Sequence, residues 1–392
     1  MTSLRQFVPS GTQETRPAGC GCASASAKPF NMMMLILSEA CNLRCIHCYE
    51  QELGYHADRK MPWDTARRAV NLLFRQIPED TPHSCITLFG GEPLLEIPLL
   101  RRIVEYSFPH RTISGYSGRK ANYIINTNGT VLPPDAILLF RQLGPRLNLR
   151  ISVDGFEESH DRVRKTKAGG GSWQLLQANF EAFRNLANWH GVRIHFVATV
   201  NRLNYSSLFH DHTRLFEALS FPIATLFVHD QPWTEEELAQ VVDQVAMLRK
   251  WCSRRGLLHS LCRFPENSRY SEDHIRNDCI CGAGVSSFTV NYRGDVFPCH
   301  RVYYFDQLDG LMLGNVHTGL LPEVVLRFQR LNRLSNMKQA CQQCPAALRE
   351  RCHLCLASNQ RVNGDWYRVS DRYCKFMKAL YEGAVREKSA VA

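Results

Sequence analysis

The sequence lacks any apolar run that approaches the roughly 20 residues of a membrane-spanning helix. Its first stretch, Met1 to Lys28, also lacks the basic head and apolar core of a signal peptide. These absences argue against a membrane-spanning or secreted protein. We therefore expect a cytoplasmic location and no membrane partner.

A long run of basic residues is missing too, although the formal net charge is +10. Tails and patches that bind nucleic acid usually concentrate Lys and Arg in blocks. The charge pattern therefore does not favour DNA or RNA as a partner. An acidic peptide, or a reductase with an acidic face, fits the net positive charge as well as nucleic acid does.

Cysteine, by contrast, is abundant, with 16 residues in the chain. Disulfides are rare in the cytoplasm, so clustered cysteines there indicate metal binding or catalysis. Cys41, Cys45 and Cys48 directly follow a short apolar run. A loop after a strand can point three thiolates at one place, as an iron–sulfur cluster requires, but such clusters normally take four protein ligands. One iron would be left for another ligand.

Apolar segments with strand character alternate with segments of helical spacing after residue 30. Strands are expected at Met32–Leu37, Cys85–Phe89, Ala121–Asn126, Leu147–Val153, Val192–Val200 and Ala224–His229. Helices are expected at Trp63–Gln76, near Ile97–Tyr106, after Pro133-Pro134, at Trp173–His190 and at Ser206–Leu219. This alternation predicts an α/β fold with a parallel sheet, closed or partly closed. Polar motifs follow the strands, at the carboxyl ends where α/β folds place their active sites.

Composition divides the chain into five predicted segments. They are a flexible N-terminal segment (1–28), an α/β core domain (29–233), a bridging helical segment capped by Thr234 (234–275), a small cysteine-rich domain (276–378) and a helical tail (379–392). The cysteine-rich segment is expected to depend on metal, since little else could hold it together. The remaining cysteines do not stand at the spacing of a known motif. Cys20 and Cys22 are expected to be a free pair, and Cys85 is expected to be a packed core thiol. Cys252 and Cys262 are expected to have a structural role.

The C-x3-C-x2-C spacing of Cys41, Cys45 and Cys48 resembles the signature of the radical S-adenosylmethionine (SAM) enzymes. His47 stands before the last cysteine, where the family often has an aromatic residue, and Tyr49 follows it. Further family motifs follow in the same order: Gly90-Gly91-Glu92-Pro93, Asn126-Thr127-Asn128-Gly129, Ser152-Val153-Asp154-Gly155, and His160-Asp161 with Arg164.

The resemblance implies a partial (β/α)6 TIM-like barrel over roughly Met32–Asp230. It also implies a 4Fe–4S cluster on the three cysteines, whose fourth iron is ligated by the amino and carboxylate groups of SAM. An electron from the cluster then yields a 5′-deoxyadenosyl radical, which removes a hydrogen atom from a substrate. Arg164 would reach the methionyl carboxylate, while the glycines allow close backbone approach and Glu92 can accept a hydrogen bond from an ammonium group. The implied cofactor-binding residues are His47, Tyr49, Gly90, Gly91, Glu92, Pro93, Asn126, Asn128, Ser152, Asp154 and Arg164.

The cysteine-rich segment resembles the SPASM extension, which carries auxiliary 4Fe–4S clusters. Cys281, Gly294 and Cys299 match its first motif. From Cys341 to Cys355, consecutive cysteines are separated by two, seven and two residues, whereas the family usually has two, five and three. By family connectivity an inner cluster takes Cys281, Cys299 and Cys355, with Cys279, and an outer cluster takes Cys341, Cys344, Cys352 and Cys374. Two alternatives stay open: Cys279 is spare and leaves an iron for a substrate thiol, or the C-x2-C pairs hold structural zinc.

Two residues near Cys299 are candidates for catalysis. In sulfatase-maturing relatives an acid follows this cysteine and is assigned as a base, whereas this chain has His300. Peptide thioether-forming relatives often have Cys-His here, followed shortly by Leu-Gly-Asn, as in Leu313-Gly314-Asn315. His300 is a candidate base or, as we favour, a hydrogen-bond partner of a cluster sulfur. Asp295 is the second candidate, although its Gly-Asp setting favours a turn role.

We therefore predict a radical SAM/SPASM oxidoreductase that modifies a ribosomally made peptide by cross-linking its side chains. The alternatives are an anaerobic sulfatase-type maturase that forms formylglycine, and an iron–sulfur electron carrier without radical chemistry. Expected partners are a precursor peptide or protein and a low-potential electron donor such as flavodoxin or ferredoxin. Residues 1–28 are too short and polar for a winged-helix leader-binding module, so a separate protein, or the barrel and SPASM surfaces, would recognise the leader.

Overall fold

The computed structural model describes residues 30–48, 50, 58–77, 84–107, 121–221, 223–228, 231–256, 262–263, 280–304, 311–344 and 355–391. Several residues singled out from the sequence lie outside these ranges, namely Cys20, Cys22, Tyr49, Cys279 and Cys352, as does the whole segment 1–28. Among the described helices, none combines the length and the apolar character needed to cross a bilayer.

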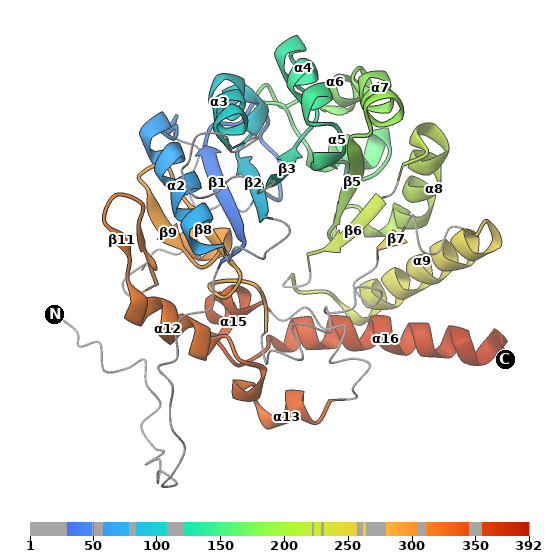
Figure 1. The fold of residues 1–392 in the computed structure, drawn as a ribbon. Helices are drawn as coiled ribbons and strands as arrows, with labels where there is room; N and C mark the ends of the chain where they lie inside the picture. Colours follow the sequence, from blue (N-terminus) through green and yellow to red (C-terminus); the bar gives the residue numbers. More distant parts are fainter. Residues whose placement is uncertain are drawn as a thin grey trace, which may run out of the picture.

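One sheet runs through the protein, and its strands β1 to β7 lie in chain order (Figure 1). The strands are β1 (Met32–Ser38), β2 (Ser84–Gly90), β3 (Ala121–Thr127), β4 (Leu147–Ser152), β5 (Arg193–Val200), β6 (Ile223–Phe227) and β7 (Cys262–Arg263). The predicted α/β fold with a parallel sheet is thus confirmed, with the starts of β1–β6 within one residue of expectation.

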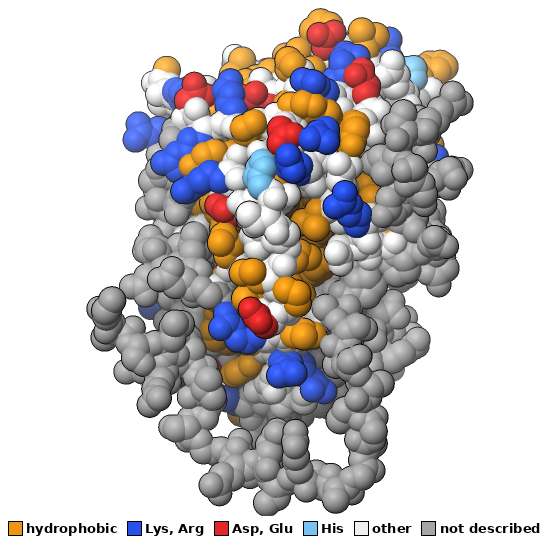
Figure 2. Space-filling model, turned by 60° about the vertical axis from the view of Figure 1, so that its left-hand side comes forward, with side chains coloured by type: hydrophobic (Ala, Val, Ile, Leu, Met, Phe, Trp, Pro, Cys, Tyr) orange, Lys and Arg blue, Asp and Glu red, His pale blue; other side chains and the backbone are white. Residues whose placement is uncertain are grey.

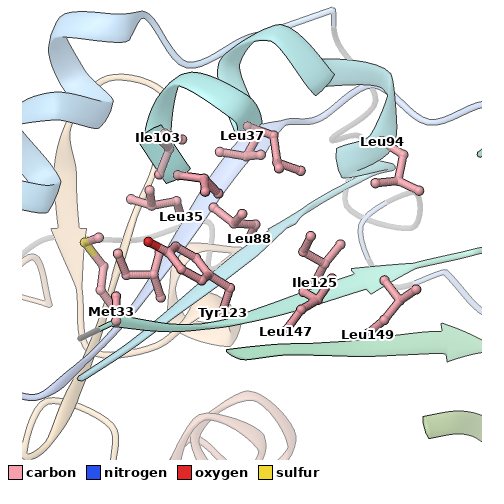
Figure 3. Close-up of a cluster of buried hydrophobic side chains, with 14 of the residues drawn as sticks. Met33, Leu35, Leu37, Leu88, Leu94, Ile103, Tyr123, Ile125, Leu147 and Leu149 are labelled. Atoms are coloured by element: carbon pink, nitrogen blue, oxygen red, sulfur yellow. The ribbon is translucent and has the colours of Figure 1, made fainter. Parts of the chain in front are cut away.

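Helices cover the outer side of this sheet (Figure 1). They are α2 (Trp63–Gln76), α3 (Ile97–Ser107), α4 (Pro134–Leu143), α5 (Glu157–Val163), α6 (Trp173–Gln177), α7 (Phe180–His190) and α8 (Leu208–Leu219). Alternate strand residues, such as Leu35, Leu88 and Leu149, are fully buried against the helices, as Figure 3 shows for four strands and Ile103 of α3. This burial is the main force that holds the core together.

The segment Trp173–His190, predicted as one helix, forms two helices, α6 and α7. At the break, the Asn179 side chain donates hydrogen bonds to the carbonyls of Gly129, at 2.9 Å, and Leu175, at 3.3 Å. The first of these bonds ties the break to the loop after β3. The interruption therefore depends on a tertiary contact that helical periodicity does not encode.

The cysteine-rich segment extends the same sheet beyond β1. Strand β8 (Ser287–Val290) pairs in parallel with β1, and β9 (Asp295–Phe297), β10 (Gly314–Asn315) and β11 (Gly319–Leu320) follow in antiparallel order. Helices α11 (His300–Tyr303), α12 (Pro322–Leu331), α13 (Gln339–Gln342) and α15 (Leu356–Asn363) accompany these strands.

Two long helices pack side by side along the far edge (Figure 1). Helix α9 (Glu235–Arg254) begins with the predicted Thr234 cap, where Thr234 and Glu237 form a reciprocal capping box. Helix α16 (Asp371–Val391) continues through the predicted boundary at 378 and buries Phe376 against α9. Cys252 is fully buried in the same apolar cluster, in agreement with its predicted structural role.

Two buried hydrogen bonds fasten α11 to the segment that carries the first three cysteines. The Tyr303 hydroxyl donates to the Glu39 carboxylate, and the Tyr304 hydroxyl donates to the Glu50 carboxylate at 2.8 Å. All four side chains belong to residues at most 4% exposed. Because Glu39 and Glu50 flank the cysteine loop, this Tyr–Glu junction sets the loop against the C-terminal part of the chain.

We predict that Tyr304→Phe destabilises the protein, because the buried Glu50 carboxylate loses its hydrogen-bond donor. The loss of such a partner costs about 1–3 kcal/mol. The measurement is the midpoint of urea unfolding followed by tryptophan fluorescence. Tyr381→Phe, at a half-buried tyrosine of α16, is the matched control. Equal midpoints for both variants would contradict a stabilising role for the junction.

Candidate functional site

The loop with Cys41, Cys45 and Cys48 begins where β1 ends and is held from two sides. On one side, the amides of Gly91 and Glu92 donate to the carbonyls of Ser38 and Ala40, both at 2.9 Å. On the other side, the amides of Arg44 and Ile46 donate to Lys165 and Val163, at 2.7 and 2.9 Å. Main-chain hydrogen bonds thus hold the loop on both sides.

Glycine at positions 90 and 91 is required by this packing. A Cβ atom on Gly91 would lie 2.4 Å from the Ala40 carbonyl oxygen, and one on Gly90, where φ is +135°, would lie 2.2 Å from that of Ser38. The sequence predicted a close approach of these glycines to a ligand. The structure shows that they approach the cysteine loop itself.

Glu92 is completely buried and joins the loops that follow β2 and β3. One carboxylate oxygen accepts from the Leu94 amide, at 3.0 Å, and the Thr127 hydroxyl, at 2.8 Å, while the other accepts from the Asn128 amide at 2.7 Å. Burial raises the pKa of Glu92 to about 7 despite these bonds. Pro93 is buried beside it and begins a short 3-10 turn.

Asn128 brings the motif after β3 next to the first cysteine. Its side-chain amide lies 3.8 Å from Cys41 Sγ and donates to Asn42 Oδ1 at 2.9 Å. Asn126 of β3 and Ser152 of β4 are half-buried and alternate with core residues, so they face away from the helices. These three predicted cofactor residues therefore lie at the carboxyl end or the inner side of neighbouring strands.

Asp154 is the centre of a buried charge network after β4. Its carboxylate forms ion pairs with Arg164, at 2.8 Å, and His47, at 3.1 Å, and accepts a hydrogen bond from the Thr199 amide at 2.8 Å. Burial opposes its ionisation, but the charges of Arg164 and then His47 hold the pKa of Asp154 well below its usual range. Arg164 also approaches Cys45 Sγ, at 3.9 Å.

Arg164 therefore has two contacts that bear on its predicted role. It pairs with Asp154 and lies beside a cysteine of the loop. Burial raises the pKa of Cys45, and the guanidinium is the main opposing influence. A cation here can stabilise a thiolate or a nearby carboxylate.

His160 supports this network from behind. Its ring lies 3.4 Å from the Asp154 amide and 3.1 Å from the Ser172 hydroxyl. Burial, followed by the charge of Arg164, lowers the pKa of His160 to about 3, so the imidazole is neutral. Asp161 accepts from the Trp173 amide at the start of α6. The His-Asp pair thus orders the loop that carries Arg164.

Some of the described cysteines of the C-terminal part influence one another electrostatically, while the two cluster groups stay a prediction. Burial, and next the charge of Cys355, raises the pKa of Cys299 to about 11. Burial, and next the charges of Cys374 and Cys344, raises the pKa of Cys341. Cys299 therefore neighbours Cys355, and Cys341 neighbours the other two, while Cys279 and Cys352 lie outside the described residues.

Cys281 is positioned by Asn332, which is almost fully buried after α12. The Asn332 side chain accepts from the Cys281 amide at 3.1 Å and donates to the Cys281 carbonyl at 2.8 Å. The Gly284 amide then donates to the Pro298 carbonyl at 3.1 Å, next to Cys299. These bonds bring the two inner-cluster candidates, Cys281 and Cys299, onto adjoining backbone.

The three thiols of the cysteine loop are suited to an iron–sulfur cluster. In the described part of the chain, no three His, Cys, Asp or Glu side chains stand at the spacing of ligands around one metal ion. In a 4Fe–4S cluster each cysteine binds a different iron, so its ligands lie further apart. Three thiols in one loop, with Asn128 and Arg164 beside them, fit such a group.

The two predicted catalytic residues occupy different settings. His300 begins α11, and its ring lies 5.3 Å from that of Phe89 in β2. Burial lowers the pKa of His300 to about 3, which makes it a weak base at neutral pH. Asp295 begins β9, and its carboxylate accepts from Asn315, at 3.0 Å, and Asn291, at 3.1 Å. A catalytic role for either residue stays a prediction.

The sequence reasoning missed the Tyr–Glu junction and Asn332. Glu39 and Glu50 lie two residues outside the first and last cysteine of the loop, and Tyr303 and Tyr304 follow Cys299 closely. Acids beside a cluster loop, and paired tyrosines after a cluster ligand, were the available signals.

We predict that Glu92→Gln alters the pH dependence of stability. The Glu92 pKa rises from about 4.5 to about 7 on folding, so its contribution is full below pH 4.5 and is lost as the pH rises through 7. The variant should therefore show a flatter fall in urea-unfolding midpoint between pH 5 and 8. Glu181→Gln, at an exposed position of α7, is the control and should keep the wild-type dependence of the unfolding midpoint on pH. The same wild-type dependence in Glu92→Gln would contradict the prediction, because it would mean that the pKa of Glu92 is not raised on folding.

Residues 35–202 match the family model of the radical SAM superfamily, and residues 279–345 match that of the SPASM iron–sulfur cluster-binding domain. An uncharacterized protein of Methanocaldococcus jannaschii is 26% identical, with 73% of this chain and 88% of that protein aligned. The cysteine-type anaerobic sulfatase-maturating enzyme of Clostridium novyi is 25% identical over 45% of each protein. The serine-type enzyme of Bacteroides thetaiotaomicron is 28% identical over 45% of this chain and 41% of that enzyme. The chain thus spans less than half the length of these two maturating enzymes.

Solved structures show the same fold. Native anSMEcpe with bound AdoMet has a TM-score of 0.71 at 18% identity, covering 92% of this chain and 98% of that one. SuiB of Streptococcus suis bound to precursor peptide SuiA has a TM-score of 0.61 at 13% identity, covering 89% and 77%. The family models, the relatives and the arrangement of the cysteine loop lead to one assignment. The chain carries a radical SAM domain at residues 35–202 and a SPASM domain at residues 279–345, and these domains imply 4Fe–4S clusters and SAM as its cofactors.

Proposed function

We propose that the protein is a maturase that removes a hydrogen atom from a ribosomally made peptide and so starts an oxidative cross-link or a similar modification. SAM, when bound and reduced by the cluster, supplies the 5′-deoxyadenosyl radical for this step. The protein's own residues hold the cofactors, orient the peptide and exclude water.

The observation that carries the proposal is the position of α11. Cys299 immediately precedes this helix, Tyr303 and Tyr304 anchor it to the cofactor loop, and His300 contacts Phe89. Cys299, the proposed ligand of an auxiliary cluster, therefore directly precedes a helix that is bonded to the cofactor loop and contacts β2. A cluster placed there suits the acceptance of an electron from a substrate radical, or direct binding of the peptide.

The charge network around Asp154 prepares the site for an anionic cluster. Arg164 and Asn128 aim donor groups at Cys45 and Cys41, and both residues are buried. Hydrogen bonds to cluster sulfurs and local burial are the means by which proteins set cluster potentials. These residues therefore tune the reduction that starts the reaction.

A peptide substrate is supported by what the structural neighbours bind. Native anSMEcpe has been solved with AdoMet and the Cp18Cys peptide, at a TM-score of 0.70, and SuiB with precursor peptide SuiA. The bond formed, the flavodoxin- or ferredoxin-like electron donor, a leader-binding partner and a cytoplasmic location are parts of the proposal that rest on the sequence.

The sulfatase-type alternative is favoured by the names of the curated relatives, which mature sulfatases. The residue after Cys299 counts against it, because His300 replaces an acid and its pKa is lowered to about 3. The electron-carrier alternative is disfavoured by the buried Glu92–Asn128 and Asp154–Arg164 contacts, which a carrier without a cofactor pocket does not need.

We predict that the reconstituted protein forms 5′-deoxyadenosine from SAM with dithionite under anaerobic conditions. Replacing Cys41, Cys45 and Cys48 together by Ala should abolish product, because the cluster that binds SAM is lost. Cys252→Ala, in the apolar cluster between α9 and α16, is the matched control and should stay active. No product from fully reconstituted wild-type protein, with or without candidate peptides, would refute the radical assignment.

We further predict that the two C-terminal cysteine groups bind separate clusters. Wild-type protein should contain about twelve iron and twelve sulfide ions, and Cys299→Ala or Cys341→Ala should each remove about four of both. Cys299→Ala with Cys355→Ala should lose no more than the single variant, because these thiols share one cluster. Zinc in place of the auxiliary iron, in metal analysis of anaerobically reconstituted protein, would overturn this assignment.

A further inference from the structure

Three polar side chains beside the first cysteine form a closed ring of hydrogen bonds, which we call the Asn–Thr ring. Asn42 Nδ2 donates to Thr130 Oγ1 at 2.8 Å, and Thr130 Oγ1 donates to Asn128 Oδ1 at 2.6 Å. Asn128 Nδ2 donates to Asn42 Oδ1 at 2.9 Å and closes the ring. Asn128 and Thr130 are buried, and Asn42 follows Cys41 directly. The ring therefore links the cysteine loop to the loop that follows β3.

The orientation of the Asn128 amide is decided by the main chain. An asparagine side chain can present either its oxygen or its NH2 group to a neighbour, and the chemistry of the neighbour decides between them. Asn128 Oδ1 lies 2.9 Å from the main-chain nitrogen of Thr130, and a main-chain N–H can only donate. The oxygen of Asn128 therefore faces Thr130, and its NH2 group faces the cysteine loop.

A count of hydrogen atoms assigns the two N–H groups of the Asn128 side chain. The Thr130 hydroxyl has one hydrogen, which goes to Asn128, so the hydroxyl oxygen accepts from Asn42. One hydrogen of the Asn128 NH2 group goes to Asn42 Oδ1. The other is directed at Cys41 Sγ, which lies 3.8 Å from Asn128 Nδ2. Each donor in the ring thus has an acceptor, and the last N–H goes to the sulfur.

The ring also fixes the plane of this amide. The χ2 torsion of asparagine has a broad energy well, so a single hydrogen bond from the Thr130 main chain leaves the amide plane free to turn. Asn42 prevents that turn, because its oxygen holds the Asn128 nitrogen while its own nitrogen is held by the Thr130 hydroxyl. Two of the three ring bonds therefore depend on the Thr130 hydroxyl.

The main chain beneath the ring is held by other contacts. The Glu92 carboxylate accepts a hydrogen bond from the Asn128 amide at 2.7 Å. The Asn179 side chain donates to the Gly129 carbonyl at 2.9 Å. Neither contact uses the Thr130 hydroxyl. Removal of this hydroxyl should therefore turn the Asn128 side chain and leave the loop in place.

We propose that Thr130 and Asn42 are positioning residues that hold an N–H of Asn128 on Cys41 Sγ and so raise the reduction potential of the cluster on the loop. The inference rests on the proposed function, because it concerns the reduction that starts that reaction. Hydrogen bonds to the sulfurs are among the features that set the potential of a cluster. A donor stabilises the reduced cluster more than the oxidised one, since the reduced cluster carries one more negative charge. Loss of the donor therefore makes the cluster harder to reduce.

The test is a potentiometric titration of reconstituted holoprotein without SAM, followed by electron paramagnetic resonance. SAM is then added to a reduced sample, and the signal that it alters identifies the loop cluster. Thr130→Val keeps the shape of the side chain and removes the hydroxyl, so it should lower the ratio of reduced to oxidised loop cluster about threefold at a given potential. For a one-electron couple this places the midpoint potential about 30 mV lower. Thr130→Ser, which keeps the hydroxyl, should have the wild-type midpoint.

A matched control and a double variant separate positioning from a general loss of packing. Thr213→Val removes the hydroxyl of an equally buried threonine, which donates to the His210 carbonyl at 3.0 Å, and should leave the midpoint unchanged. Asn128→Leu should lower the midpoint at least as far as Thr130→Val. Thr130→Val added to Asn128→Leu should have no further effect, because Thr130 acts through Asn128. Thr130→Ala carries the same prediction and replaces Thr130→Val if that variant does not take up its clusters.

Two outcomes would overturn the inference. The first is a wild-type midpoint in the loaded Thr130 variant that lacks the hydroxyl. The second is an equal shift by that variant with and without Asn128→Leu, which would mean that Thr130 does not act through Asn128. The proposed function is judged separately, from 5′-deoxyadenosine formation by the wild-type protein. If none forms while the midpoints shift as expected, the proposed function fails and the role of the Asn–Thr ring stands.

Discussion

The parallel pairing of β8 with β1 is the constraint on which the arrangement of this protein depends. It places the SPASM strands on the same sheet as the radical SAM strands, so two sequence domains share one hydrogen-bonded framework. The cofactor loop leaves β1, and Cys299 follows β9, which is hydrogen bonded to β8. The hydrogen-bond register of β1, β8 and β9 therefore fixes the position of Cys299 relative to the cysteine loop.

The Tyr–Glu junction completes what the sheet begins. Strand pairing positions backbones, whereas Tyr303 and Tyr304 hold the two ends of the cysteine loop through their hydroxyl groups. Both carboxylates are buried, and leaving them without donors would be costly. Charge is handled in the same way at Asp154, where Arg164 and His47 surround a buried carboxylate. The site is thus built from compensated buried charges rather than from exposed polar groups. The surface differs: in the view of Figure 2, Lys and Arg side chains are interspersed with acidic and hydrophobic ones.

Much of this could be read from the sequence, because local signals dominate the α/β part. The strand segments alternate or run apolar, and the cysteine and glycine motifs follow them at fixed points, so the fold, the cofactors and the cofactor loop were predictable. Contacts between distant residues were not. Asn179 interrupts a helix by reaching Gly129, and Tyr303 reaches Glu39 across 264 residues. The role of Gly90 and Gly91 was also hidden, because their neighbour is the backbone of the cysteine loop. No periodicity within a helix or strand records such partners.

The pairing of β1 has a consequence for how the protein matures. β1 and its cysteine loop leave the ribosome early, whereas β8, Tyr303 and Tyr304 are made well over 200 residues later. Until then one edge of β1 has no partner, and unpaired strand edges invite aggregation. The cysteine loop also lacks its second set of anchors during this interval. The cysteine loop therefore gains its full set of hydrogen-bonded anchors only after the C-terminal part of the chain has folded onto the sheet.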